Sequence, residues 1–395
     1  MLISLKNLWI LQVGALAVLL VHTTVSINVF EFLQFLSYAF LWLVILSFLI
    51  LCVFTLQRPR MTYYGMSICV YFLLLIILSL LNGTDIKGAI YTSIEVALLL
   101  MIFYYFRDRL RLTLYTCAIV FAAITYGNLI FMLMFPDWLY QAKDSFYGYL
   151  LGGNYNQMGG RIICGLATNV LCLQFSRKWL INVIPLFIVS IFTMLLVGSM
   201  TSFTCLTLYA LLCLIPTMSL KKLSVIGLFV VYLMFQVFVV FAGEGLYNNE
   251  FVAYFIEQIL GKDLSFTYRT TMWASAGESF SQSPIWGYGE VDTDWYLSNM
   301  SSLAIGPHNF IYAVLLRGGI ILISLLIGIF TISLKQLMGG GINPHSIKLL
   351  MAIEVWLVMS LMEVYPIFFI LYLLTLAYYY PYMFASSNLE KRVIQ

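Results

Sequence analysis

Long apolar runs alternate with short polar connections from one end of the chain to the other. Each run is close to the length that an α-helix needs to cross the hydrocarbon core of a bilayer, about 20 residues. The pattern predicts an all-α fold, a polytopic integral membrane helical bundle that forms a single domain over residues 1–395. The twelve expected spans lie at 8–26, 31–56, 64–81, 88–106, 112–135, 158–175, 179–197, 203–216, 223–242, 308–333, 349–365 and 367–385.

Basic residues are distributed unequally between the two sets of connections. One set receives 14 of the 20, namely Lys6, Arg58, Arg60, Arg107, Arg109, Arg111, Arg177, Lys178, Lys221, Lys222, Lys335, Lys348, Lys391 and Arg392. Basic residues favour the cytoplasmic side, so we expect a multi-pass membrane protein with both termini in the cytoplasm.

Composition agrees with this arrangement and excludes a soluble globular domain. Of the 395 residues, 62% are hydrophobic and only 9% are charged, whereas globular proteins have about 25% charged residues. All seven cysteines fall in predicted spans, so we expect no disulfide framework and no zinc site. The first apolar run has no small-residue cleavage site and is interpreted as a span, not as a signal peptide.

A large extracytoplasmic loop is predicted between spans 9 and 10, at residues 243–307. Its aromatic content indicates order, with one short helix over 248–262 and another from 268 onward. In the second helix Met272, Trp273, Ala276 and Phe280 share one face, with Arg269 at its start. A turn-rich segment then leads to the tenth span.

Charged groups at membrane depth are costly, so each is a candidate for function. The candidates are Arg161, Arg317, Glu95, Glu354 and Glu363. Together with Arg269, the two arginines could converge near the outer leaflet, where guanidinium groups would bind a pyrophosphate. Two alternatives stay open: Arg317 pairs with Glu363, or Arg161 extends its side chain toward the lipid headgroups.

His308 follows Gly306 and Pro307 at the expected start of the tenth span. A neutral imidazole that faces the external medium can act as a general base on a hydroxyl group. The alternative is that His308 only caps the helix. We expect no cofactor and no metal, although Asp292 and Asp294 in the loop could hold a cation.

Two segments of this region, "YRTTMWASAGESFSQSPIWGYG" at 268–289 and "HNFIYAVLLRGGI" at 308–320, resemble a known signature. They are similar to the O-antigen ligase and polymerase superfamily of bacterial envelope glycosyltransferases. In that family an Arg is followed four residues later by a Trp, then by a Gly-x-Gly segment and by His-Asn at the start of a span. "GGNYNQMGG" at 152–160 and "LLVGSMTSF" at 195–203 also look like segments that precede the loop in that family.

The resemblance implies a GT-C-like glycosyltransferase of the bacterial cytoplasmic (inner) membrane, which acts on the outer side of that membrane on an undecaprenyl-pyrophosphate-linked glycan. It makes His308 and Arg269 the catalytic pair, with substrate contacts from Arg161, Arg317, Asn309, Asn156, Trp273 and Tyr268. The lipid-linked glycan and membrane lipid would be its partners, a chain-length regulator and a flippase could join them, and no nucleic acid is expected.

Two departures from the family pattern affect the expected anion site. Gly198-Ser199-Met200 stands where ligase-like members have Gly-Ser-Arg, and Arg317 stands where an acid often occurs. The missing Gly-Ser-Arg, together with the short cytoplasmic connections, favours a polymerase of O-antigen or capsular repeat units over a ligase that transfers finished glycan to lipid A core or protein. A lipid-linked oligosaccharide flippase or transporter is the alternative from another class, but no repeat between halves is visible and the long external loop fits it poorly.

Overall fold

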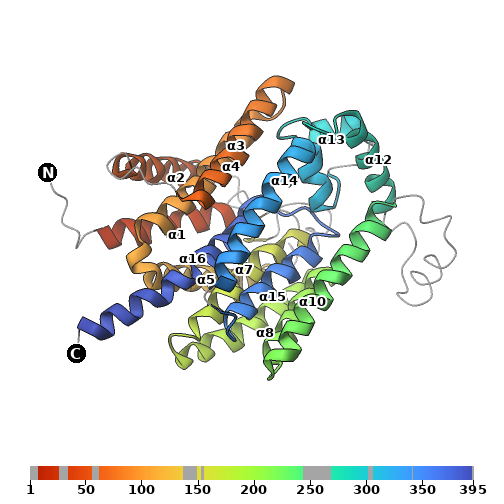
Figure 1. Ribbon diagram of the computed structural model, residues 1–395. Coiled ribbons are helices and arrows are strands. Elements are labelled where there is room, and N and C mark those ends of the chain that lie inside the picture. Colours follow the sequence, from red (N-terminus) through yellow and green to blue (C-terminus); the bar gives the residue numbers. More distant parts are fainter. Residues whose placement is uncertain are drawn as a thin grey trace.

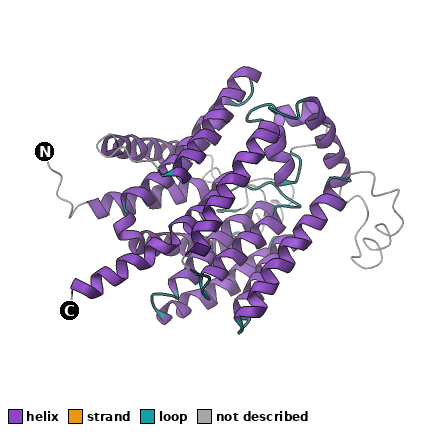
Figure 2. Ribbon diagram, in the orientation of Figure 1, coloured by secondary structure: helices purple, strands orange, loops and turns teal. Residues whose placement is uncertain are grey.

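The computed structural model describes residues 8–25, 34–55, 62–136, 149–152, 155–242, 268–300, 306–339 and 341–393. Within these ranges the chain forms a bundle of helices joined by short connections (Figure 1). Figure 2 shows helices and loops throughout the described part, with no β-strand in it. The predicted all-α class is therefore confirmed.

A helix is present at each of the twelve predicted spans. In chain order they are α1 (Leu8–Thr24), α2 (Gln34–Thr55), α3 (Tyr63–Asn82), α4 (Ile86–Tyr105), α5 (Leu110–Met134), α7 (Met158–Cys172), α8 (Leu180–Leu196), α9 (Met200–Leu214), α10 (Met218–Phe235), α14 (Phe310–Gly339), α15 (Ser346–Met359) and α16 (Ile367–Val393). Seven of the described helices are long and apolar enough to cross a membrane. The protein is thus a polytopic membrane protein, while the count of twelve spans stays a prediction.

One difference from the predicted boundaries affects the candidate site: the eleventh helix ends earlier than expected. α15 ends at Met359, and residues 360–366 form a non-helical connection to α16. Pro366 disfavours the helical conformation at Tyr365, which helps to explain why the helix does not continue. Glu363 therefore lies in a connection and not in a span.

The centre of the bundle is α7, in which every residue from Met158 to Cys172 is buried. Its glycines let neighbouring elements come close, since a Cβ at Gly165 would stand 2.9 Å from the Phe121 side chain. The outer helices α2, α8 and α10 expose apolar side chains such as Leu46, Ile181 and Leu223. Such exposed apolar surfaces are typical of helices that face lipid.

Two short helices, α12 (Arg269–Gln282) and α13 (Thr293–Asn299), lie beside the first half of α14 (Figure 1). The predicted amphipathic face of α12 is confirmed, because Met272, Trp273 and Ala276 are buried. α13 was not predicted. The other short helix expected in the loop, over 248–262, lies outside the described residues.

The segment between α12 and α13, residues 283–292, is here called the strap. It crosses α14 at a kink where Gly318 and Gly319 leave helical geometry, with φ +59° at Gly319. There Tyr288 N donates to Leu316 O at 2.8 Å and Ile320 N donates to Pro284 O at 2.9 Å. The strap thereby satisfies backbone groups that the broken helix leaves without helical partners.

Candidate active site

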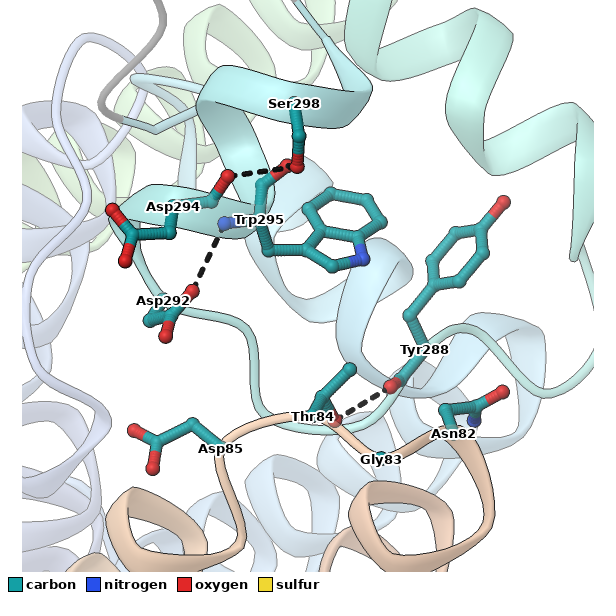
Figure 3. Close-up of a pocket in the computed structure, with 9 residues that line it drawn as sticks. All are labelled: Asn82, Gly83, Thr84, Asp85, Tyr288, Asp292, Asp294, Trp295 and Ser298. Atoms are coloured by element: carbon teal, nitrogen blue, oxygen red, sulfur yellow. Dashed lines mark hydrogen bonds between the residues drawn. The ribbon is translucent and has the colours of Figure 1, made fainter.

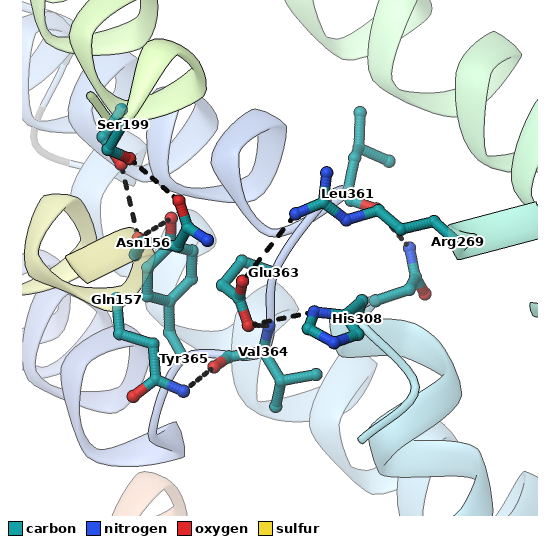
Figure 4. A network of polar contacts seen from close by, with 11 residues as sticks. Asn156, Gln157, Ser199, Arg269, His308, Leu361, Glu363, Val364 and Tyr365 are labelled. Carbon is teal, nitrogen blue, oxygen red and sulfur yellow. Dashed lines mark hydrogen bonds and ion pairs between the residues drawn. The ribbon is translucent and has the colours of Figure 1, made fainter. Parts of the chain in front are cut away.

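Five connections meet at one end of the bundle: residues 155–157, 197–199, 268–269, 306–309 and 360–366. The predicted topology assigns all five to the external side, although the side of the membrane itself stays a prediction. The polar side chains of these connections form the network drawn in Figure 4. It is the candidate active site.

Glu363 joins the two residues of the predicted catalytic pair. Its Oε1 lies 3.4 Å from His308 Nδ1, and its Oε2 lies 4.0 Å from Arg269 Nη2 (Figure 4). The carboxylate side chain is only 6% exposed, whereas those of His308 and Arg269 are 15% and 22% exposed. The acid is thus held beneath two groups that retain access to solvent.

The backbone around His308 is fixed by Asn309. The Asn309 amide group donates to Gln236 Oε1 at 2.9 Å and to Leu361 O at 3.2 Å, and its oxygen accepts from Tyr312 N at 3.0 Å. These contacts hold the preceding residue, His308, at φ +45°, a value that non-glycine residues seldom adopt.

Asn309 is fully buried and its amide contacts protein groups, so the structure gives it a supporting position instead of the predicted substrate contact. The imidazole of His308 is contacted by Glu363.

Asn156 ties the neighbouring connections to this cluster. Its side-chain oxygen accepts from Ser199 Oγ at 3.3 Å, and its backbone oxygen accepts from the Tyr365 hydroxyl at 3.3 Å. Gln157 Nε2 donates to Val364 O at 3.0 Å. The predicted residue Asn156 therefore lies within the network, in contact with the connection that carries Glu363.

Arg161 lies in the first turn of α7 and is buried next to this network. Its Nη1 donates to Gln157 O at 3.1 Å, and its guanidinium carbon stands 5.2 Å from the centre of the Phe369 ring. No acidic side chain pairs with it in the part of the chain that the structure describes. Its predicted extension toward the headgroups is wrong, because the residue is only 5% exposed.

Arg317 is not part of the cluster, so the predicted convergence of three arginines is wrong for this residue. Its Nη2 lies 2.6 Å from Glu290 Oε1 in the strap. The alternative pairing of Arg317 with Glu363 is wrong as well, because that carboxylate faces His308 and Arg269. Burial raises the pKa of Glu290, and the guanidinium of Arg317 partly offsets this rise.

The remaining two predicted residues have different surroundings. Tyr268 precedes α12 with φ +65° and is exposed, beside the cluster residue Arg269. Trp273 is fully buried and packs with Tyr312 and Leu316 of α14. Its place is in the core under α12, contrary to the predicted substrate contact, because the amphipathic face of this helix turns inward.

Glu363 was predicted to be one of the charged residues at membrane depth but was not assigned to the site. The only available signal was an acid close to the predicted end of a span. No group of three His, Cys, Asp or Glu side chains is placed to hold a metal ion within the described ranges. Asp292, considered above for a cation, instead caps α13 by accepting from Trp295 N at 2.9 Å.

Comparison with known families adds a separate finding to this geometry. Residues 185–327 match a family model described as O-antigen ligase. This match confirms the resemblance to the O-antigen ligase/polymerase superfamily. The matched segment contains Arg269 and His308, and it supports an O-antigen ligase/polymerase-type function, that of glycosyltransferase-like enzymes. Comparisons with curated proteins and with solved structures give no match.

Proposed function

We propose that the protein polymerises undecaprenyl-pyrophosphate-linked oligosaccharide repeat units into O-antigen or capsular polysaccharide. The reaction takes place on the outer side of the cytoplasmic membrane. The observation that carries the proposal is the contact of Glu363 with both His308 and Arg269 at the end of the bundle that the topology assigns to the outside.

His308 is the general base of the proposed reaction. A proton on Nδ1 faces Glu363, which leaves Nε2 free to accept the proton of the acceptor sugar hydroxyl. A carboxylate behind an imidazole fixes the tautomer and stabilises the cation that forms, as in other carboxylate–histidine pairs. Glu363 is therefore a positioning residue that acts through His308.

The acceptor oxygen then attacks the anomeric carbon of the donor glycan. The glycosidic bond forms as the bond between that carbon and the pyrophosphate oxygen breaks, and undecaprenyl pyrophosphate leaves with the bonding electron pair. Arg269 stabilises the charge that develops on this leaving group. Arg161, buried without an acidic partner in the described residues, adds positive charge behind Tyr365.

Polymerase and ligase differ in the acceptor, which is a second lipid-linked glycan in one case and lipid A core or protein in the other. Gly198-Ser199-Met200 favours the polymerase, because the arginine of ligase-like members is missing at Met200. Ser199 binds Asn156 in the network, so this position is close to the proposed reaction.

A flippase is the second candidate function. The buried charged residues of the bundle centre, such as Glu354, are the observation that favours it. A flippase needs no general base, whereas the His308 cluster has the composition of a transferase site.

Complementation of a polymerase-deficient strain tests the proposal. Its surface glycan would be resolved by gel with the wild-type protein, with His308→Ala and with Arg269→Ala, and membrane protein levels would be measured in parallel. We expect both variants to lose the long-chain ladder while single repeat units stay attached. Loss of all attached glycan with accumulation of lipid-linked polymer would indicate the ligase, and normal ladders in both variants would exclude catalysis at this site.

A further inference from the structure

A polar pocket lies beside the strap, away from the His308 cluster. It has a volume of about 440 Å³ and is lined by Asn82, Gly83, Thr84, Asp85, Tyr288, Asp292, Asp294, Trp295 and Ser298 (Figure 3). The turn between α3 and α4 forms one wall, and the strap with α13 forms the other. Pockets that bind small molecules span a range of about 300–1,000 Å³, which includes this one.

The lining combines two aromatic rings with groups that bind hydroxyls. The rings of Tyr288 and Trp295 have centroids 4.9 Å apart, and both residues are partly exposed. Around them stand an amide at Asn82 and hydroxyls at Thr84 and Ser298. Apolar ring faces next to hydrogen-bonding groups suit a sugar ring, which has apolar C–H faces and a rim of hydroxyl groups.

Hydrogen bonds hold the two walls together, so the pocket exists before any ligand binds. Thr84 Oγ1 donates to Tyr288 O at 2.9 Å, and Asp85 N donates to Glu290 O at 2.9 Å. Glu290 N in turn donates to Ser79 Oγ at 2.7 Å. A preformed site saves the entropy of ordering its walls on binding.

The pocket is also linked to the candidate active site. The Tyr288 hydroxyl donates to Ser279 O in α12 at 2.7 Å, and α12 begins with Arg269 of the cluster. Ten residues separate Ser279 from Arg269, which is about 15 Å along a helix axis. A glycan several sugars long could therefore extend from the cluster toward the pocket.

We infer that this pocket is a saccharide-binding subsite that holds a sugar of the glycan at a distance from the reacting bond. This inference rests on the proposed polymerase function, and in it the pocket is the place where a growing chain is held. Three carboxylates and no basic side chain line the pocket, so it selects a neutral or amino-bearing sugar and repels an anionic one.

One arm of the test uses the purified full-length protein with lipid-linked repeat units from its host. Trp295→Ala and Asp294→Asn are compared with Trp286→Ala, a control whose exposed ring belongs to the strap but does not line the pocket. We expect both pocket variants to form bonds but to make shorter chains, and the control to match the wild type. A chain-length distribution equal to that of the wild type in both pocket variants would overturn the inference.

The second arm measures binding without catalysis, so that failure of the subsite is distinguished from failure of the proposed function. Oligosaccharides released from the host's surface glycan are the probe, and saturation-transfer NMR reports binding to the protein in nanodiscs. Trp295→Ala should weaken binding about 3- to 10-fold, and Asp294→Asn about 10-fold, while Trp286→Ala leaves it unchanged.

Wild-type protein that binds these oligosaccharides but does not join repeat units would refute the polymerase and retain the subsite. Binding that is equal in all variants, or stronger for oligosaccharides that carry carboxylates, would refute the subsite.

Discussion

Replacement of Glu363 by Gln removes a charge from the centre of the candidate active site while the side-chain volume stays nearly the same. In the wild type the carboxylate lies 3.4 Å from His308 Nδ1 and is 6% exposed, so water screens it little. The amide of Gln can face the imidazole through its NH₂ group, which favours the wrong tautomer and places the proton on Nε2. His308 would then be unable to accept a proton from the acceptor hydroxyl.

The size of the effect follows from the geometry. General base catalysis contributes about 10²- to 10⁴-fold, and loss of the acid behind a catalytic histidine in serine proteases costs about 10⁴-fold. Since 3.4 Å is a long contact, we expect kcat to fall by about 10²- to 10³-fold, or about 3–4 kcal/mol in the barrier. KM should change little, because the interaction strengthens only in the transition state.

The assay is the initial rate of polymerisation of lipid-linked repeat units by purified protein in nanodiscs. Glu363→Asp, which retains the charge but withdraws it by one methylene group, should recover part of kcat. Glu278→Gln is the matched control, because Glu278 is an exposed acid of α12. A Glu363→Gln protein that is as folded and as fast as the wild type would refute the assignment of the base and its partner.

Substitutions at three other positions, Arg161, Gly319 and Glu290, test a buried charge, the backbone kink of α14 and the ion pair of the strap. Arg161→Met should lower kcat/KM about 10-fold and Arg161→Lys should restore it, because the proposed contribution of Arg161 to catalysis is its positive charge. Equal rates for the two variants would exclude this contribution. Gly319→Ala should lower the free energy of unfolding by about 1–3 kcal/mol in a detergent melt, since φ +59° strains any side chain, whereas Gly328→Ala in open helix should be neutral or stabilising. Glu290→Gln should destabilise by about 2–3 kcal/mol by leaving Arg317 unpaired, and a second change of Arg317 to Gln should recover part of this loss; additive losses would contradict the pairing.

Helix positions followed directly from the sequence, because the apolar length needed to cross a membrane recurs in the chain and the amphipathic period of α12 is regular. The connections were harder to predict. α15 ends six residues before the predicted boundary, since apolar composition continues through Leu361, Met362 and Val364 after the helix has ended. Hydropathy reports the preference of side chains for an apolar medium and carries no information on backbone conformation.

Charge partners could not be predicted either, because the two members of each pair are far apart in the sequence. His308 and Arg269 were identified from a motif, but their partner Glu363 is more than 50 positions further along the chain. Arg317 pairs with the strap because the kink at Gly318 and Gly319 brings Glu290 to it. Such pairings depend on how helices pack, and a single sequence carries no direct record of that packing.

The proposed reaction joins lipid-linked repeat units with His308 as the base. The most direct measurement is the product formed by the purified protein from lipid-linked repeat units alone, resolved by gel, for the wild type and for His308→Gln. We expect the wild type to form a ladder of longer lipid-linked chains, with one undecaprenyl pyrophosphate released per bond, and the variant to form no ladder. A ladder of equal intensity from His308→Gln, or no product until lipid A core is added, would contradict the proposed reaction.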